Sequence, residues 1–364
     1  MEGKHWPIKP REFRCEEAAA LILSSNGGLE IFTGDPSCNY IIRNRPQVTT
    51  SSQTISLIDD LLVIVGFSVS DSSWLYMSME NTRGGLLANK WTQSSTIGKE
   101  TPSYHVSSIS GHDLVQIGGG NTQANLMTGV LGSFKLVWAN SANTFESFPK
   151  YACGVKINRD EFIVIGGEDE KTKQIVKTVL KINVLTKTVK KMHDIRTSRV
   201  EHGCEVTSGN QLLISGGHNN LKDPATNIIQ TDEVITITSM DIEESKVVDN
   251  GLNKYQHQMI LLKDTIFSIG GTDSSGVATK EIKKYNTITN TWSQAGTLKS
   301  GTAGVVAVTA FPKTSVDCIG QCRCGMSPTD SRRIFDGSQA QVSQHILPIC
   351  SKIIEKVRQN SYLL

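Results

Sequence analysis

The stretch "TIFSIGGTDSSGVATKEIKKYNTITNTW", from Thr265 to Trp292, decides the fold. A short apolar run ends in Gly270 and Gly271, and a polar segment then leads to Tyr285 and, seven residues later, to Trp292. A glycine pair after a strand can cradle a phosphate when it opens a helix. It can also form a sharp corner between two strands. The rest of the chain distinguishes the two interpretations.

The same corner recurs along the chain, which identifies a repeat. Glycine pairs follow "DLVQI", "EFIVI" and "QLLIS" as well as "TIFSI". Their first glycines stand at 118, 166, 216 and 270, so the steps are 48, 50 and 54 residues. The weaker copies "LLVIVGF" and "ALILSS" precede them and bring the number of units to six. Because each corner leads into another strand-like run, we expect the glycines to be structural.

Each unit is predicted to contain four short strands, a to d, with the glycines at the end of strand b. Alternating runs such as "HGCEVTSG" and "YQHQMILLK" lie upstream of the glycines and supply strand a. Strands c and d, joined by a tight turn, explain a recurring seven-residue spacing of large apolar residues. The pairs are Trp138 and Phe145, Ile182 and Val189, and Tyr285 and Trp292.

Together these features resemble kelch repeats. The double glycine, the downstream apolar pair and the Arg-x-x-His of "RVEHG" are hallmarks of that family, and the resemblance covers about residues 18 to 310. It implies a β-propeller, in which four-stranded blades surround a channel. The residues that it assigns to the structural motif are Gly118, Gly119, Gly166, Gly167, Arg199, His202, Gly216, Gly217, Gly270, Gly271, Tyr285 and Trp292.

The two ends of the repeat region predict how the propeller closes. The first unit starts at its strand b, whereas "SGTAGVVAVTAF" (Ser300 to Phe311) is a lone strand of the innermost type. We expect this strand to complete the first blade, giving six blades, with seven as the alternative. Residues 1–17 form a lead-in, 18–311 the propeller, and 312–364 a connector with Cys318, Cys322 and Cys324 and a short C-terminal helix.

Composition narrows the classes of partner and compartment. The 37 Lys and Arg nearly balance the 35 Asp and Glu, which disfavours nucleic acid and anionic membranes. No apolar stretch near the N-terminus is long enough for a signal peptide or a membrane span, so a cytoplasmic location is predicted, or a secreted one if a signal peptide is missing. The seven lysines from Lys171 to Lys191 predict a solvated face, with docking of an acidic partner as the alternative.

No cysteine or histidine pattern indicates chemistry. His105, His202 and His257 occupy equivalent places in different units, which favours a structural role over a metal site. Cys153 and Cys204 stand at matching positions of "YACGV" and "HGCEV" and are expected to be small buried thiols. The three cysteines near residue 320 fit a disulfide or free thiols better than zinc. Neither a Gly-x-Ser-x-Gly elbow nor a His-Glu-x-x-His motif is present, so we predict no enzyme, cofactor or metal.

Function is expected in the loops, because a rigid scaffold recognises partners through its loops. The b–c and d–a connections must emerge on one face, and that face resembles the protein- and peptide-binding face of kelch adaptors. We therefore predict a non-catalytic binding module, a scaffold or substrate-recognition subunit. The alternative is a secreted kelch-type propeller with carbohydrate-binding or oxidase-like activity. The candidate partner-binding residues are Tyr104, Asn121, Gln123, Glu168, Asp194, Arg196, His218, Asn219, Lys222, Tyr255, Asp273 and Ser274.

Overall fold

A computed structural model describes strands between residues 19 and 140, then residues 148–298 except 159, 170, 239–241, 243–245, 250 and 263, and finally residues 305–311. Before residue 148, it describes the side chains of Ala20, Ile22, Glu30 and Phe32. The predicted C-terminal helix and the cysteines at 318, 322 and 324 lie outside the described residues. Among the described residues, one three-residue 3-10 turn, Ala225–Asn227, is the only helical element, and no helix is long and apolar enough to cross a membrane.

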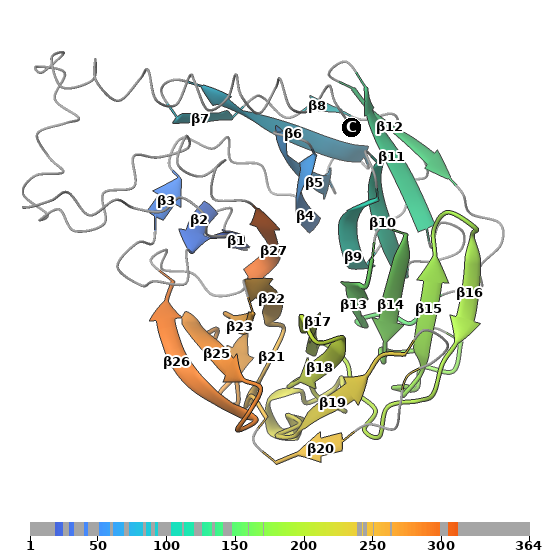
Figure 1. Cartoon of the computed structure of the whole chain (residues 1–364), viewed down its shortest axis with the longest axis vertical. Coiled ribbons are helices and arrows are strands. Elements are labelled where there is room, and N and C mark those ends of the chain that lie inside the picture. The colour runs from blue at the N-terminus through green and yellow to red at the C-terminus, as the bar shows by residue number, and fades with distance from the viewer. Residues whose placement is uncertain are drawn as a thin grey trace, which may run out of the picture.

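The predicted all-β class is confirmed, since the described chain consists of antiparallel sheets (Figure 1). The first sheet has the order β27 (Val305–Phe311), β1 (Ala19–Ser24), β2 (Leu29–Phe32) and β3 (Tyr40–Ile42). The second has β4 (Ser51–Ile58), β5 (Leu61–Ser68), β6 (Ser73–Thr82) and β7 (Gly85–Ala88), with β8 (Thr92–Gln93) also paired to β6. The third has β9 (Ser103–Ser110), β10 (Asp113–Gly119), β11 (Leu126–Gly132) and β12 (Lys135–Asn140).

Three further sheets follow in the same style. The fourth has β13 (Cys153–Lys156), β14 (Glu161–Ile165), β15 (Val179–Asn183) and β16 (Thr188–Lys191). The fifth has β17 (Gly203–Val206), β18 (Gln211–Ser215), β19 (Asp232–Thr236) and β20 (Lys246–Val248). The sixth has β22 (Gln258–Leu262), β23 (Thr265–Ile269), β25 (Glu281–Asn286) and β26 (Thr291–Thr297). A short pair, β21 (Lys254–Tyr255) and β24 (Thr272–Asp273), extends it.

The first strand of each sheet lies nearest the middle of the molecule, and the last lies at the periphery (Figure 1). These innermost strands contact one another in series, from β4 to β9, β13, β17 and β22. β22 also contacts β27, and β27 contacts β4, so the series returns to its starting point. Each sheet thus has its innermost strand toward a common centre and packs between two neighbouring sheets.

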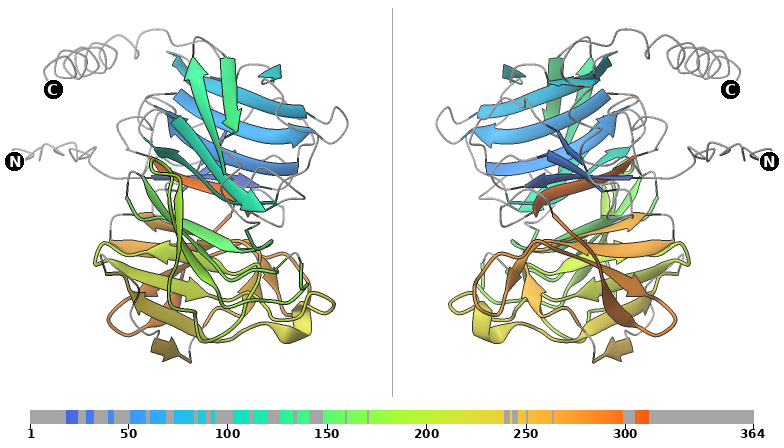
Figure 2. Two further views of the ribbon diagram at one scale, coloured as in Figure 1. Left: turned by 90° about the vertical axis from the view of Figure 1, so that its right-hand side faces the viewer. Right: turned by 90° about the vertical axis from the view of Figure 1, so that its left-hand side faces the viewer.

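The C-terminal strand completes the first sheet, as the sequence predicts. β27 pairs antiparallel with β1, with Ala310 opposite Ala20, and the two strands lie side by side in Figure 2. Ala20, Ile22 and Phe32 of this sheet are buried against the sixth sheet, where Phe32 meets Phe267 edge to face at a centroid distance of 5.0 Å. Residues from both ends of the repeat region therefore share one core.

The glycine pairs that follow β14, β18 and β23 are corners between strands, as predicted, whereas Gly118 and Gly119 lie within β10, opposite Tyr104 and Ser103 of β9. Gly166, Gly216 and Gly270 have φ values of 61°, 61° and 63°, which are in the left-handed region that favours glycine. A Cβ on Gly166 would come within 2.6 Å of the carbonyl oxygen of Arg199 in the next sheet. The second glycine of each pair continues the contact, because the Gly167 N–H donates to Arg199 O at 2.9 Å and the Gly217 N–H to Lys254 O at 3.0 Å. The glycines let one sheet approach the next.

The seven-residue apolar pairs of the fourth and sixth sheets are cross-strand neighbours, as predicted. The prediction is wrong for the third sheet, because Trp138 lies on its last strand, β12, opposite Gly129 of β11, and Phe145 lies outside the described residues. Tyr285 lies opposite Trp292 across β25 and β26, and Ile182 lies opposite Val189 across β15 and β16. The Tyr285 and Trp292 rings are 5.0 Å apart. The Trp292 indole N–H reaches the preceding sheet, where it donates to Asp232 Oδ2 at 2.8 Å. The pair therefore joins the fifth and sixth sheets.

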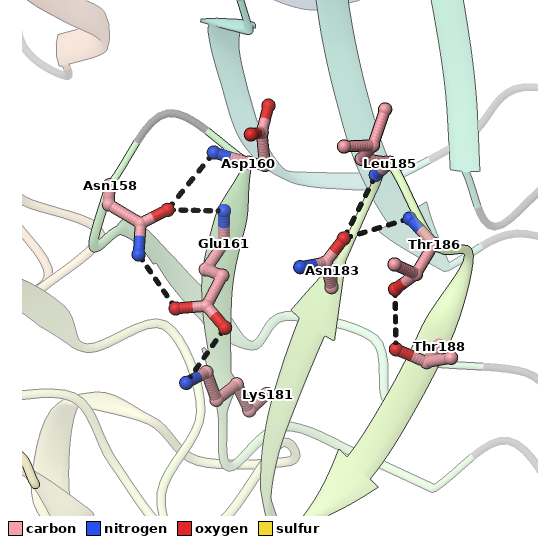
Figure 3. Close-up of polar contacts among 8 residues, drawn as sticks. All are labelled: Asn158, Asp160, Glu161, Lys181, Asn183, Leu185, Thr186 and Thr188. Carbon is pink, nitrogen blue, oxygen red and sulfur yellow. Dashed lines mark hydrogen bonds and ion pairs between the residues drawn. The ribbon is translucent and has the colours of Figure 1, made fainter. Parts of the chain in front are cut away.

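Asparagine side chains close the turns at the other end of the sheets (Figure 3). Asn158 Oδ1 accepts the backbone N–H groups of Asp160 and Glu161, both at 3.0 Å. Asn183 Oδ1 accepts from Leu185 at 3.1 Å and from Thr186 at 2.9 Å. These side-chain bonds replace the backbone bonds that a tight turn cannot make. This turn end is opposite the end where the glycine corners lie.

A disulfide joins Cys153 of β13 to Cys204 of β17, so the expectation of two free thiols at matching positions is wrong. Backbone pairing gives the reason. Cys153 lies opposite Ile165, and Gly203 lies opposite Ser215, each just before a glycine pair, so Cys153 corresponds to Gly203. Cys204 is one residue further along its strand, and successive residues of a strand point to opposite faces. This offset turns the two sulfur atoms toward each other.

Candidate functional site

The loop end of the molecule is formed by the b–c loops and the d–a segments of the fourth, fifth and sixth sheets. Each b–c loop pairs with the d–a segment that precedes its own sheet. The bridges join Lys150 to Glu168, Val200 to His218 and Tyr255 to Thr272. The loops are thus held in place by backbone pairing beyond the ends of the strands. This agrees with the predicted grouping of the two kinds of connection at one end.

Three residues at equivalent positions form a column across the loop end. Tyr151, Glu201 and Gln256 each lie two residues before the innermost strand of their sheet, and their φ values are 57°, 53° and 54°. The Glu201 N–H donates to Tyr151 O at 2.9 Å, and the Gln256 N–H donates to Glu201 O at 2.8 Å. Non-glycine residues rarely adopt this backbone conformation. Here the hydrogen-bonded ladder holds it from sheet to sheet.

Side chains gather around Glu201 in what we call the Glu201 cluster: Glu201, His218, Tyr255, Gln256 and Thr272. Gln256 Nε2 donates to Glu201 Oε1 at 2.9 Å, and His218 Nε2 lies 3.0 Å from Glu201 Oε2. The His218 and Tyr255 rings meet edge to face at 5.3 Å. Thr272 Oγ1 donates to Gln256 Oε1 at 3.4 Å. The cluster connects the fifth and sixth sheets through polar contacts.

The field around the cluster is negative. Burial raises the pKa of Tyr255, and the charges of Glu201 and Asp273 raise it further. Asp273 is held in place because its Oδ1 accepts from the backbone N–H groups of Ser275 at 2.8 Å and Val277 at 3.0 Å. His218 is buried and its Nδ1 has no hydrogen-bond partner among the described residues. The cluster therefore combines a carboxylate, a buried imidazole and an exposed amide, with the Asp273 carboxylate nearby.

A buried ion pair forms the frame beneath the fifth sheet's loop. Arg199 Nη2 lies 2.9 Å from Glu233 Oε1, and both side chains are fully buried. Arg199 Nη1 also donates to Gly216 O and Thr231 O, at 3.1 and 3.2 Å, which are the two ends of the b–c loop. Arg199 therefore holds the two ends of this loop together.

Lys254 occupies the corresponding position in the sixth sheet but has no such acid. Glu233 lies opposite Ile214 in its sheet, and the residue in the matching register of the sixth sheet is Lys283, opposite Ser268. Lys254 is 2% exposed, and its Nζ has no hydrogen-bond partner among the described residues. Burial lowers the pKa of Lys254 to about 7, and the nearby charge of Lys283 contributes to the shift.

The predicted partner-binding residues divide into four groups. Glu168, His218 and Tyr255 are buried, and two of them, His218 and Tyr255, come together in the Glu201 cluster. Asp273 is half-buried beside them. Tyr104 lies on β9, and its side chain, like Asn121 and Gln123, is outside the described residues. The exposed members are Asp194, which pairs with Lys191 at 3.4 Å, and Arg196, Asn219, Lys222 and Ser274.

The column residues Tyr151, Glu201 and Gln256 were missed by the sequence-based prediction. A signal for them exists, because each occupies the same place in "PKYAC", "RVEHG" and "KYQHQ". Glu201 lies between Arg199 and His202 of the Arg-x-x-His pattern, and its side chain faces the loop end. Among the described residues, no three His, Cys, Asp or Glu side chains lie together in a way that could hold a metal ion.

Comparisons with known proteins inform the fold alone. No family model and no curated protein matches the sequence. The structure resembles a solved protein titled "Structure of YjhT" with a TM-score of 0.54 and 11% sequence identity, over 72% of this chain and 88% of that one. It is one of 373 solved chains that match. An architecture shared by so many chains does not specify an activity.

Proposed function

We propose that the chain is a six-bladed kelch-type propeller in which each sheet of four or more strands is one blade. The support comes from the innermost strands, which contact one another in series and return from β22 through β27 to β4. Pairing of β27 with β1 covers the edge of β1 that would otherwise be open. The glycine corners and the Tyr285–Trp292 pair lie where kelch repeats would have them.

We further propose that the loop end binds a protein or peptide partner without catalysing a reaction. The observation that carries this proposal is the column of Tyr151, Glu201 and Gln256. Residues in sparsely populated backbone conformations persist where the surroundings hold them, and such residues concentrate at functional sites. The column repeats one backbone geometry three times while varying the side chain, as a recognition surface requires.

The surroundings of the column suit a peptide with apolar and basic side chains. Tyr151 is 42% exposed on the fourth sheet, Leu221 is 38% exposed on the fifth and Val277 is 59% exposed on the sixth. These apolar groups lie on the same end as the negative charges of Glu201 and Asp273. Hydrophobic anchors surrounded by polar groups are typical of protein interfaces.

The proposal is tested by selecting a displayed library of random peptides against the purified chain. The selected peptides are then measured against Tyr151→Asn and Gln256→Asn. Asparagine tolerates the left-handed region well, so these changes shorten the side chain without adding backbone strain. Leu185→Ser is the matched control, because Leu185 is 74% exposed on a turn at the opposite end.

We expect the two loop-end variants to weaken peptide binding at least tenfold and the control to bind like the unchanged protein. If no peptide is enriched, or if all three variants bind equally, the loop end is not the binding surface. Circular dichroism melts of each variant show whether a loss of binding is a loss of folding.

A second candidate function, a secreted propeller that binds carbohydrate, is favoured by two observations. Disulfides persist in oxidising compartments, and Cys153 is bonded to Cys204. An exposed tyrosine beside an amide and a carboxylate also suits a sugar ring, which offers an apolar face and many hydroxyl groups. A glycan array probed with the same three variants separates this candidate from peptide binding.

A further inference from the structure

The Cys153–Cys204 disulfide joins the fourth sheet to the fifth. Cys153 begins β13, Cys204 is the second residue of β17, and these innermost strands contact each other. Cys204 is 5% exposed and belongs to a cluster shared by both sheets, which includes Ile165 and Val179 of the fourth and Ile214 and Ile235 of the fifth. The bond therefore ties the two sheets together inside their common core.

The same short region carries two members of the column. Tyr151 is two residues before Cys153, and Glu201 is three residues before Cys204. The Glu201 N–H donates to Tyr151 O at 2.9 Å, and the Gly167 N–H donates to Arg199 O at 2.9 Å. Two hydrogen bonds and one covalent bond thus set the position of Tyr151 relative to Glu201.

The contact between the fifth and sixth sheets can be compared with the contact between the fourth and fifth. By the pairing of strands, Gly203 corresponds to Cys153 and Met259 corresponds to Cys204. A Cβ placed on Gly203 would lie 2.6 Å from Met259 Sδ, so the methionine side chain fills the place of the disulfide. Backbone bonds from Gly217 to Lys254 and from Gln256 to Glu201 are retained there. The fourth and fifth sheets are therefore joined by a disulfide, whereas the fifth and sixth sheets are joined at the equivalent place by a packing contact.

We propose that the Cys153–Cys204 disulfide is a covalent clasp that holds the fourth and fifth sheets together at the loop end. The position of Tyr151 relative to Glu201 then depends on oxidation of the two cysteines. The clasp forms by exchange with a small disulfide oxidant. One protein thiolate attacks the oxidant and expels a small thiolate, and the second protein thiolate then attacks the mixed disulfide and expels another. The two protein thiols lose two electrons and two protons, and the oxidant becomes two thiols.

Burial makes the clasp persistent once it has formed. Cys153 is half-buried whereas Cys204 is buried, so we expect an external thiolate to attack at Cys153. Attack there expels Cys204 as a thiolate into an apolar cluster, and burial in apolar surroundings disfavours the thiolate. Reduction in the folded protein is therefore expected to be slow. The inference concerns assembly of the loop end and does not depend on which ligand binds there.

The first experiment maps the bond in the full chain. The protein is denatured without reductant, alkylated with iodoacetamide and digested for mass spectrometry. We expect a cross-linked peptide pair containing Cys153 and Cys204, with neither residue alkylated. The proposal is overturned if both cysteines are alkylated in folded protein that has never been exposed to a reductant.

The second experiment measures the effect on the loop end. Amide hydrogen exchange is compared between the unchanged protein and Cys153→Ala/Cys204→Ala. We expect exchange at least tenfold faster in peptides containing Glu201, whose N–H bonds to Tyr151 O, and little change in peptides containing Gln256, whose N–H bonds to Glu201 O. Equal protection of Glu201 in both proteins overturns the clasp.

If Cys153→Ala/Cys204→Ala fails to fold, the hydrogen-exchange comparison can still be made on the unchanged protein. The unchanged protein is then reduced with dithiothreitol at low urea and its thiols are blocked, and exchange is measured on this sample and on the oxidised one. The same selective loss at Glu201 supports the clasp. A uniform change over the fifth and sixth sheets contradicts it. The experiments use no ligand, so they can fail while the peptide-binding proposal stands, and the reverse also holds.

Discussion

Replacing Lys254 by methionine should stabilise the protein, although replacing Arg199 by methionine should destabilise it. The two residues occupy the same position in successive sheets. Arg199 is paired with Glu233, whereas Lys254 is buried beside Lys283 with no hydrogen-bond partner for its Nζ among the described residues. A buried amine without a partner opposes folding, because it must lose either its hydration or its proton.

The magnitude follows from the pKa shift of Lys254. Its pKa falls from 10.5 in an exposed side chain to about 7 in the folded chain. At about 1.4 kcal/mol per pKa unit, the penalty at pH 7 is about 4 kcal/mol. Because methionine does not fit the site as lysine does, we expect Lys254→Met to raise the free energy of unfolding by about 2–4 kcal/mol. Arg199→Met leaves Glu233 buried without its partner and should lower it by about 3–5 kcal/mol.

The pH dependence identifies the cause. A lysine with a lowered folded-state pKa releases its proton on folding between pH 7 and 10.5, so the stability of the unchanged protein rises across that window. The advantage of Lys254→Met should therefore shrink by about 3 kcal/mol between pH 7 and 9.5.

Urea titrations at both pH values, followed by circular dichroism, measure the difference. The reasoning fails if Lys254→Met is less stable than the unchanged protein at pH 7 and the difference is the same at pH 9.5. It also fails if the two methionine variants lose stability equally, because the acidic partner would then make no difference.

Three further predictions concern single contacts. Gly217→Ala should destabilise the protein by about 3 kcal/mol or more, because a Cβ there would lie 2.5 Å from Val200 O at a φ of 78°. Gly276→Ala should lower stability by only about 1 kcal/mol, because Gly276 has a φ of 71° but its Cβ would meet no atom of the described residues within 4 Å. Urea titration compares the two variants. Burial raises the pKa of Glu205 from 4.5 to about 7, so it takes up a proton on folding and stability falls as pH rises through this range. Glu205→Gln should reduce that loss of stability by about 2–3 kcal/mol. The prediction fails if the free energy of unfolding depends on pH equally in the variant and in the unchanged protein between pH 5 and 7. Trp292→Phe removes the hydrogen bond to Asp232, whose pKa burial raises to about 6, and should lower the thermal midpoint through a loss of about 1–3 kcal/mol; an unchanged midpoint would show that this bond adds nothing.

Much of the fold could be predicted because the repeat exposes it several times. β14, β18 and β23 end at the glycine pairs, where the apolar runs end in the sequence. The pairing of β27 with β1 followed from a first unit that lacks its innermost strand. The cysteines show where this reasoning stops. Matching "YACGV" to "HGCEV" by letter aligned Cys153 with Cys204, but facing direction is set by pairing with the neighbouring strand, which shifts them by one residue.

The candidate site was predictable as a region and less so as residues. The alternating direction of the strands predicts that the b–c and d–a connections lie at one end. Polar loop residues look alike in a sequence whether they face solvent or a neighbouring loop, so His218 and Tyr255 were chosen as surface groups although they are buried against Glu201 and each other. Glu201 itself was hidden between two motif residues, and only the backbone geometry reveals its place in the column.

The partnership of β27 with β1 has a consequence for biosynthesis. A ribosome releases β1, β2 and β3 long before β27, so the first sheet must wait for residues 305–311 before it can be completed. During that interval β1 presents an unpaired edge to other nascent chains. Contacts between residues so distant in sequence also slow folding, because a large loop must close first. Chaperones that shield exposed strands would act on this protein chiefly before β27 is translated.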